Sequence, residues 1–200
     1  CSSIAIAEGM KSDKQIIVTT PASLRTNYYE ELKKCGDSLY RKNQFWEFVS
    51  NDGKPNIVDV LSSALGLPKE FIRSQNGAWL VDASKPSNFG QLDSQQQKQI
   101  DEQLNEMIRV KYVDINYNGL TSRVFNELTE NETYNPFDHS VVVIDEAHNL
   151  VSRIINKIKS MESLSQKLYE LLLSATNVKI VLLTGTPIIN YPNEIGVLYN

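Results

Sequence analysis

The chain has 200 residues, of which 41% are hydrophobic and 22% are charged, and its formal net charge at pH 7 is -4. These values are typical of one globular domain with a sizeable core, and they exclude a strongly basic field that would attract nucleic acid over the whole surface. No apolar run approaches membrane-spanning length, and the first residues do not form a signal peptide, so we expect no membrane partner.

The ends of the chain suggest a fragment of a longer polypeptide. The sequence opens on Cys1 instead of methionine, residues 2–8 already resemble the inside of a helix, and Asn200 ends it in mid-pattern. The cysteines, Cys1 and Cys35, are too few and too far apart for a zinc site or a disulfide framework. This cysteine usage favours a reducing, intracellular location in the cytoplasm or nucleus.

A buried strand is predicted at residues 15–19 (Gln-Ile-Ile-Val-Thr). Thr20 is expected to cap the following helix, and Pro21 to occupy its first turn. The strand end and the helix start then meet at Thr20, Pro21, Ala22 and Ser23, where free backbone N–H groups suit a phosphate. The alternative is an ordinary helix terminus, because most such termini in α/β proteins bind nothing.

Turn signals are frequent from about residue 45 to residue 90, and this region is predicted to be an irregular insertion in the domain. Residues 71–73 and 78–81 flank the dipeptide Asn76-Gly77, and we expect them to pair as a short hairpin. Ser94 and Gln97 then resemble a capping box at the start of an amphipathic helix. Residues 110–115 alternate like a strand, and the turn Asn118-Gly119 follows them.

The most informative stretch is residues 141–148 (Val-Val-Val-Ile-Asp-Glu-Ala-His), a strand buried on both faces that ends in two carboxylates and a histidine. In an open α/β sheet, the carboxyl ends of parallel strands line the ligand crevice, so Asp145 and Glu146 indicate a metal or phosphate site. The alternative is that Asp145 caps a helix and Glu146 lies in its first turn.

A second amphipathic helix is predicted from Leu164 to about Asn177, and a buried strand at residues 180–183 leads into the polar turn 184–187. Three apolar runs therefore end in small polar or acidic residues, with helical patterns between them. The sequence predicts an α/β fold with a parallel sheet, helices on both faces, and a single site at the carboxyl ends of the strands.

The two carboxylates suit hydrolysis of a nucleoside triphosphate. Asp145 would hold Mg²⁺ on the β- and γ-phosphates, and Glu146 would orient or deprotonate the attacking water. The hydroxyls of Thr184 and Thr186 are candidates to hydrogen-bond His148, although ordinary turn chemistry would explain them equally well. Zinc is not expected, because the chain has too few histidines and cysteines near this point.

With these motifs in this order, the chain resembles the first motor domain of superfamily 2 helicases, in the Swi/Snf-like branch that includes helicases of large DNA viruses. Asp145-Glu146-Ala147-His148 is similar to motif II, the Walker B element, and residues 183–188 with their continuation to Asn200 are similar to the extended motif III. Residues 21–24 with Asn27 and Glu30 resemble motif Ia, and Asn118-Gly119-Leu120 resembles motif Ib.

The resemblance implies a RecA-like, P-loop NTPase fold over residues 1–200 and a protein that couples ATP hydrolysis to movement on DNA, or on RNA. Asp145 and Glu146 would handle magnesium and water, while His148, Thr184, Gly185 and Thr186 would couple hydrolysis to movement. Backbone contacts to nucleic acid, without base readout, would fall to the segments Thr20–Ser23 and Asn118-Gly119. A viral role in transcription or genome processing, in a virion or viral factory, would also fit.

Two parts of such a motor are not found in the 200 residues. No Gly-x-x-x-x-Gly-Lys-Ser/Thr loop occurs, since Gly53-Lys54 is followed by Pro55, and we expect that loop and its strand to lie upstream. A second RecA-like domain with an arginine finger would lie downstream. The fragment alone is therefore expected to be inactive as an ATPase. The alternative function is a catalytically degenerate helicase-like domain that acts as a binding or assembly module.

Overall fold

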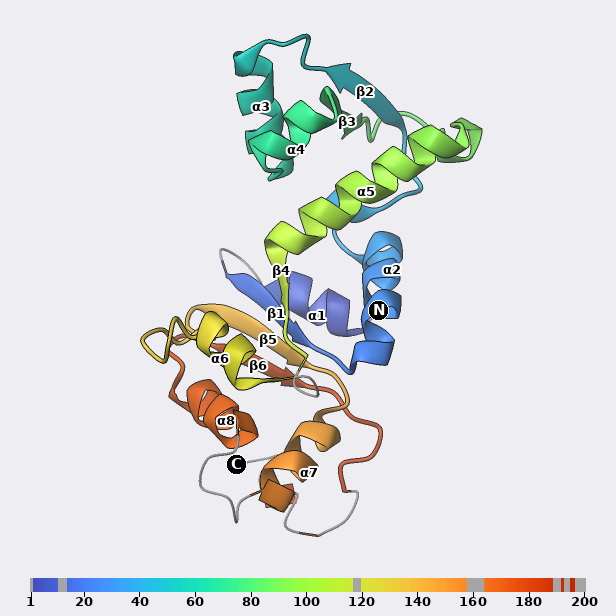
Figure 1. Ribbon diagram of the computed structural model, residues 1–200. Coiled ribbons are helices and arrows are strands. Elements are labelled where there is room, and N and C mark those ends of the chain that lie inside the picture. Colours follow the sequence, from blue (N-terminus) through green and yellow to red (C-terminus); the bar gives the residue numbers. More distant parts are fainter. Residues whose placement is uncertain are drawn as a thin grey trace. The chain divides into compact units, whose positions relative to one another are not determined.

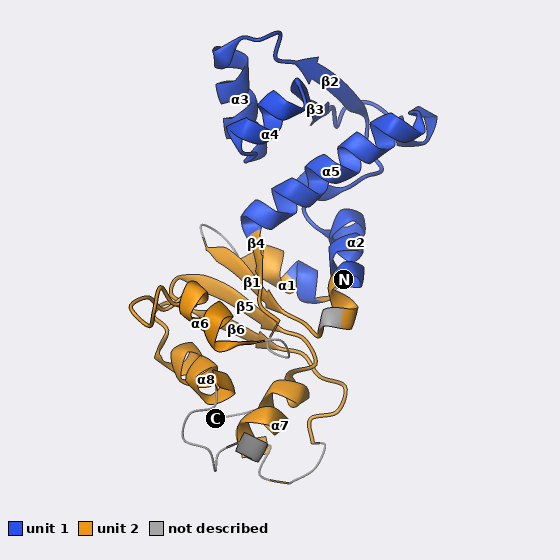
Figure 2. Cartoon of the chain, viewed as in Figure 1, with its two compact units in different colours: residues 1, 3–5, 26–111 blue, residues 2, 6–25, 112–200 orange. Residues whose placement is uncertain are grey.

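The computed structural model describes residues 2–10, 14–116, 120–157, 164–188, 192 and 195–196. Within it the chain forms two compact units, which Figure 2 shows in different colours. Unit 1 is built mainly from residues 26–111, and unit 2 mainly from residues 6–25 and 112–200. The predicted insertion lies inside unit 1. Among the described helices, none combines the length and the apolar character needed to cross a bilayer.

Unit 2 contains a four-stranded sheet in the order β4-β1-β5-β6, and each neighbouring pair is parallel (Figure 1). The strands are β1 (Gln15–Thr19), β4 (Tyr112–Asp114), β5 (Ser140–Ile144) and β6 (Lys179–Leu182). All five residues of β5 are buried, as expected for its run of β-branched side chains in the middle of a parallel sheet. The predicted α/β class is confirmed, and the arrangement agrees with a RecA-like fold.

Helices cover both faces of this sheet. Ile17 and Val142 are neighbours in register, and both belong to the core that α7 (Ala147–Lys157) and α8 (Leu164–Ser174) cover. Tyr112 faces the opposite side of the sheet, and its hydroxyl donates a hydrogen bond to Glu8 of α1 (Ser2–Met10). The short helix α6 (Ser122–Leu128) buries Phe125.

The boundaries of two predicted elements differ from the structure. The helix α5 (Ser94–Lys111) extends into the predicted strand 110–115, so that β4 begins only at Tyr112. The capping box is shifted by one residue: the Asp93 carboxylate accepts hydrogen bonds from the backbone N–H groups of Gln95 and Gln96, and Gln96 accepts one from the backbone of Asp93. Ser94 is not the cap, because Asp93 already satisfies the first free N–H groups of the helix.

The predicted hairpin between residues 71–73 and 78–81 is wrong. Residues 71–73 belong to α4 (Lys69–Ser74), and β3 (Gly77–Val81) pairs antiparallel with β2 (Trp46–Ser50) instead. The helix α3 (Pro55–Leu65) separates β2 from α4 and ends at Gly66, which is left-handed with φ 66°. The turn signal Asn51-Asp52-Gly53 therefore follows the end of β2, and Asn76-Gly77 lies at the start of β3, with α3 and α4 between the two strands.

On each outer edge of the β2–β3 ribbon, a side-chain amide forms hydrogen bonds with the backbone of the edge strand. The amide of Gln103, on α5, accepts a hydrogen bond from the Trp79 backbone N–H at 2.8 Å and donates one to the Trp79 carbonyl at 2.8 Å. The amide of Asn88 makes the same pair of hydrogen bonds with the backbone of Trp46, at 2.8 and 2.9 Å. One residue of each strand thus has its outward backbone N–H and carbonyl groups satisfied where another strand would otherwise pair.

The segment after β1 also departs from the prediction. Pro21 is the N-cap of a 3-10 helix (Ala22–Leu24) and makes no side-chain capping bond, and α2 (Arg25–Cys35) begins after it. Thr20 is therefore not the cap. Cys35 is disulfide-bonded, which differs from the expectation of reduced cysteines; separation in sequence does not prevent pairing in space. The other cysteine of the sequence is Cys1, outside the described residues.

Candidate functional site

The carboxyl ends of β1, β5 and β6 meet at one edge of the sheet. Backbone hydrogen bonds of 2.9 Å continue the ladder past the strand ends, from Asp145 N–H to the Thr19 carbonyl and from Leu183 N–H to the Ile144 carbonyl. A further bond of 2.9 Å joins the Ala147 N–H to the Leu183 carbonyl. The three predicted turns therefore adjoin one another, because the parallel register brings their strands to the same edge.

The two acidic residues differ in backbone conformation. Asp145 directly follows β5, is half-buried, and accepts a hydrogen bond at 3.1 Å from the backbone N–H of Glu146. Glu146 is left-handed with φ 51°, a conformation that costs a non-glycine residue about 1 kcal/mol and is concentrated at functional sites. Since α7 begins at Ala147, neither acid lies in its first turn, and the interpretation of Glu146 as a first-turn residue does not apply.

His148 joins this turn to the turn after β6. Its Nδ1 lies 2.6 Å from Thr184 Oγ1 and 3.2 Å from Thr186 Oγ1, and the His148 side chain is only 12% exposed. The predicted hydrogen bonds between His148 and the two threonines are thus confirmed. The same Nδ1 lies 3.4 Å from Glu146 Oε2, so the His148 ring lies beside both the Glu146 carboxylate and the threonine turn.

The threonine turn is held in shape by its own hydrogen bond. Thr184 Oγ1 accepts from the backbone N–H of Thr186 at 3.1 Å, which is a local side-chain turn around Gly185. Gly185 and Thr186 are exposed, whereas Thr184 is half-buried. The hydroxyl of Thr184 accepts the hydrogen bond of the turn and also contacts His148. The two interpretations of this threonine, turn chemistry and contact with His148, are therefore compatible.

The segment after β1 lies at the same edge. Thr19 Oγ1 donates to the Val143 carbonyl at 3.3 Å, which fastens the end of β1 to β5. Thr20 is 1% exposed, and its hydroxyl has no hydrogen-bond partner among the described residues. Pro21 precedes the 3-10 helix, to which Ala22 and Ser23 belong, and Ser23 is exposed. Asn118 and Gly119, the predicted second contact segment, lie outside the described residues.

The donor set fits magnesium better than a softer metal. Asp145 and Glu146 offer carboxylate oxygens, the ligands that Mg²⁺ prefers, and Mg²⁺ commonly takes one or two protein carboxylates together with substrate phosphates and waters. No group of three or more His, Cys, Asp or Glu side chains suited to a metal occurs in the part of the chain that the structure describes. A closed protein cage of the zinc type is therefore not found among these residues.

An ion pair at the neighbouring strand end was not predicted. Arg25, the first residue of α2, places Nε 3.0 Å from Oδ2 of Asp114, the last residue of β4. The sequence offers a signal only in retrospect: Asp114 is an acid at the end of a strand, like Asp145. Its partner is 89 positions away, and no periodicity connects the two.

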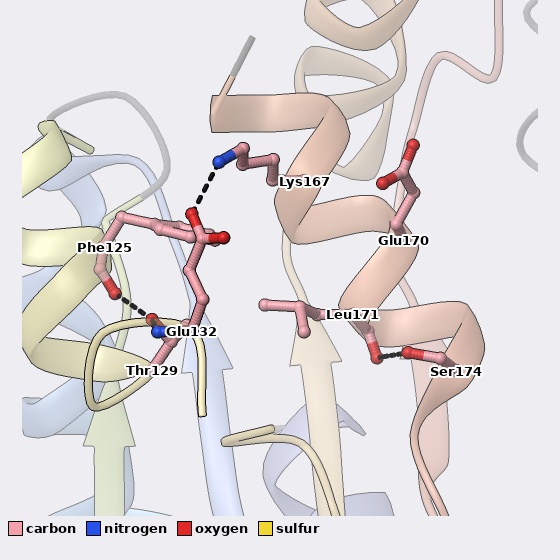
Figure 3. Close-up of a pocket in the computed structure, with 7 residues that line it drawn as sticks. All are labelled: Phe125, Thr129, Glu132, Lys167, Glu170, Leu171 and Ser174. Atoms are coloured by element: carbon pink, nitrogen blue, oxygen red, sulfur yellow. Dashed lines mark hydrogen bonds and ion pairs between the residues drawn. The ribbon is translucent and has the colours of Figure 1, made fainter. Parts of the chain in front are cut away.

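A separate pocket of about 360 Å³ lies elsewhere in unit 2, between α8 and the end of α6 (Figure 3). Lys167 points toward Glu132 across it, with 2.5 Å between Nζ and Oε1. None of the predicted site residues lines this pocket. Its lining residues are Phe125, Thr129, Glu132, Lys167, Glu170, Leu171 and Ser174.

Comparison with known proteins gives one informative match. The chain is 29% identical over 202 residues to a protein of Acanthamoeba polyphaga mimivirus named "Putative ATP-dependent RNA helicase". The match covers 100% of this chain and 26% of that protein, so the chain spans about a quarter of the relative's length. No family model matches the chain, and no solved structure matches it. The similarity supports a helicase-like relationship.

Proposed function

We propose that the chain is part of an ATP-dependent motor on nucleic acid, of the superfamily 2, Swi/Snf-like type. The observation that carries the proposal is the arrangement at the end of β5, where Asp145 and the left-handed Glu146 lie beside a histidine that is hydrogen-bonded to the next strand's turn. The similarity to the mimivirus protein supports the same activity.

In this proposal Asp145 holds Mg²⁺ and Glu146 acts on the attacking water. Bound magnesium would neutralise charge on the β- and γ-phosphates of ATP. The Glu146 carboxylate, 39% exposed, orients the water and accepts its proton. Because His148 Nδ1 contacts both Glu146 and Thr184, protonation of Glu146 changes the charge beside the threonine turn. We propose this contact as the coupling step, together with Gly185 and Thr186.

Nucleic acid is the proposed partner of the same edge of the sheet. Thr20–Ser23 and Asn118-Gly119 would contact the backbone without reading bases. The motif resemblance favours duplex DNA, whereas the relative is named for RNA, so a direct comparison of the two substrates is part of the test. We further propose that the phosphate loop and a second RecA-like domain are supplied by the full-length protein. The 200 residues alone should then show no turnover.

The test is Glu146→Gln in the full-length protein. The amide keeps the size of the side chain but cannot accept the proton, so we expect ATP hydrolysis to fall at least about a hundredfold while ATP binding is retained. Hydrolysis is measured with and without DNA and RNA, and binding by titration of a labelled nucleotide. The matched control is Glu170→Gln, an exposed glutamate on α8 outside the site.

Retained hydrolysis in Glu146→Gln would refute the assignment of the water-activating residue. A wild-type protein that binds nucleic acid but hydrolyses no ATP would favour the alternative function, a degenerate domain that serves as a binding or assembly module.

A further inference from the structure

Two neighbouring buried threonines at the end of β1 differ in their hydrogen bonds. Thr19 is 2% exposed, and its hydroxyl donates to the Val143 carbonyl at 3.3 Å. Thr20 is 1% exposed, and its hydroxyl has no hydrogen-bond partner among the described residues. A buried hydroxyl without a partner costs free energy, because it has lost its hydrogen bonds to water. Such a group indicates a partner that is acquired in another state of the protein.

A nucleic-acid contact does not explain this hydroxyl. The segment Thr20–Ser23 is proposed to contact a nucleic-acid backbone, but Thr20 is buried, whereas Ser23 is exposed. A ligand on the surface of this segment therefore reaches Ser23 and not the Thr20 hydroxyl. The partner of the hydroxyl must be a group that lies next to it at the sheet edge.

Asp145 is the polar residue that follows the neighbouring strand. β1 and β5 pair in parallel register up to Thr19 and Ile144, and the Asp145 N–H donates to the Thr19 carbonyl at 2.9 Å. Thr20 and Asp145 are thus the next residues of two adjacent chain segments. Residues in register on parallel strands point to the same face of the sheet, so continuing the register by one residue directs both side chains to the same face.

The Asp145 carboxylate has room for a further donor. Its Oδ1 accepts a hydrogen bond from the backbone N–H of Glu146 at 3.1 Å. A carboxylate has about four acceptor positions on its two oxygens, so this bond leaves positions for a metal ion and for a second donor. Carboxylates that bind a metal are in turn hydrogen-bonded by nearby groups, which fix their orientation. Thr20 offers such a donor beside Asp145.

We propose that Thr20 is a positioning residue, whose hydroxyl donates a hydrogen bond to the Asp145 carboxylate when that carboxylate holds Mg²⁺. The inference rests on the proposed function, in which Asp145 is the magnesium ligand, and deepens it by assigning the group that orients this ligand. Thr20 touches neither ATP nor the attacking water, so its whole effect passes through Asp145.

The experiment measures binding of a labelled ATP analogue to the full-length protein over a series of Mg²⁺ concentrations. Thr20→Val keeps the shape of the side chain but removes the hydroxyl, and it should raise the Mg²⁺ concentration for half-maximal binding about tenfold. Thr20→Ala also lacks the hydroxyl and should shift it in the same direction. Thr20→Ser retains the hydroxyl and should respond to Mg²⁺ like the wild type. Nucleotide binding in the presence of a metal chelator should be the same in all of these variants.

Thr19→Val is the matched control, because it removes the neighbouring hydroxyl, which already has its partner. This variant should leave the Mg²⁺ dependence unchanged but raise amide hydrogen exchange in the peptide of residues 15–19, since it breaks a bond between β1 and β5. Thr20→Val should not raise this exchange, because the hydroxyl that it removes has no partner without the metal. The two variants therefore separate positioning of the metal ligand from packing of the strand.

A double-mutant cycle tests whether Thr20 acts through Asp145. Asp145→Asn removes the charge of the metal ligand and should itself shift the Mg²⁺ dependence. Thr20→Val should then add no further shift in the Asp145→Asn background, whereas two independent effects would add.

A Mg²⁺ dependence of Thr20→Val equal to that of the wild type would overturn the inference, as would an equal shift in Thr19→Val or an additive shift in the double variant. Weaker nucleic-acid binding in Thr20→Val, with unchanged Mg²⁺ dependence, would assign the hydroxyl to the nucleic acid and also overturn it. In each of these cases Asp145→Asn still shifts the Mg²⁺ dependence, so the proposed function stands. A wild-type protein whose ATP binding does not depend on Mg²⁺ would overturn both.

Discussion

A buried lysine in unit 1 forms an ion network whose strength depends on pH. Lys33 is 3% exposed, and its Nζ lies 3.0 Å from Glu30 Oε1 and 2.8 Å from Asp101 Oδ1. Lys42 bridges the same two acids at 3.2 and 2.6 Å. Burial favours a higher pKa for Glu30 and Asp101, but the hydrogen bonds and charges of the two lysines outweigh it and hold both pKa values below their ordinary range.

The lowered pKa values determine how the stability of the fold depends on pH. A carboxyl whose pKa is lower in the folded state contributes stability above its ordinary pKa, which is 3.8 for Asp101, and loses that contribution as the pH falls through the folded value. Asp101→Asn should therefore lower the free energy of unfolding by about 1 kcal/mol at pH 7, after allowance for solvent screening, and by less at pH 3. Urea unfolding at both pH values measures the difference.

Asp59→Asn is the control for this experiment. Asp59 pairs with Lys69 at 2.8 Å, but both side chains are about half exposed, so solvent screens the pair. Its removal should change the free energy of unfolding little at either pH. A loss in Asp101→Asn that is as large at pH 3 as at pH 7 would contradict the ion-pair explanation.

The sequence identified which residues belong to the candidate site, but not their backbone conformation or their partners. Asp145, Glu146 and His148 stand out in the sequence because acids rarely end a buried apolar run. The left-handed backbone of Glu146 was not predictable, since it depends on the ladder bonds that β1 and β6 supply. The pair of Arg25 and Asp114 was missed for the same reason, because only the pairing of β1 with β4 brings it together.

At the scale of elements, the β2–β3 ribbon depends on a glycine at the start of β3. Gly77 lies opposite Ser50 in register and has φ 152°. A Cβ at this position would overlap the Val49 carbonyl oxygen and lie 2.8 Å from Cζ of Phe48. The two strands can therefore approach each other only where the residue has no side chain.

Gly77→Ala should destabilise unit 1 by about 3 kcal/mol, because either the Val49 carbonyl or the strand pairing must shift. Denaturant unfolding followed by tryptophan fluorescence is a suitable measurement, since Trp46 and Trp79 lie on the two strands. Gly90→Ala is the matched control: Gly90 has open space around it, and its substitution should be nearly neutral. Equal stability of the two variants would show that the ribbon tolerates the added methyl group.

The ribbon also shows where sequence patterns mislead. The dipeptide Asn76-Gly77 is a strong hairpin signal, and Asn76 does take a positive φ of 56°. The turn nevertheless joins a helix to a strand, because the partner of β3 is β2, supplied by residues 46–50. The positions of the parallel strands of unit 2 were predicted more accurately, since apolar runs leave few alternative structures. The prediction that residues 180–183 are buried is wrong, because β6 is an edge strand and its residues Ile180 and Leu182 are exposed.

At the scale of the whole molecule, each of the two units buries hydrophobic residues of its own. The core under α7 and α8 is formed by residues of unit 2, including Ile17, Val142 and Leu168. The buried residues Trp46, Ile72 and Leu104 belong to unit 1. The sequence predicted the sheet of unit 2 from its apolar runs, but the irregular pattern of residues 45–90 did not show how far unit 1 extends.

The division of the chain into two compact units leads us to expect separate local unfolding. Leu168 is 1% exposed, and Leu168→Ala should cost about 3 kcal/mol by leaving a cavity under α8. We expect this variant to raise amide hydrogen exchange in β5 and β6 but not in β2 and β3, and Gly77→Ala to do the opposite, because a cooperative unit opens as a whole. Hydrogen-exchange mass spectrometry of peptides from residues 46–50, 77–81, 140–144 and 179–182 distinguishes the two patterns. An equal increase in all four peptides, in either variant, would show that the chain unfolds as a single cooperative unit.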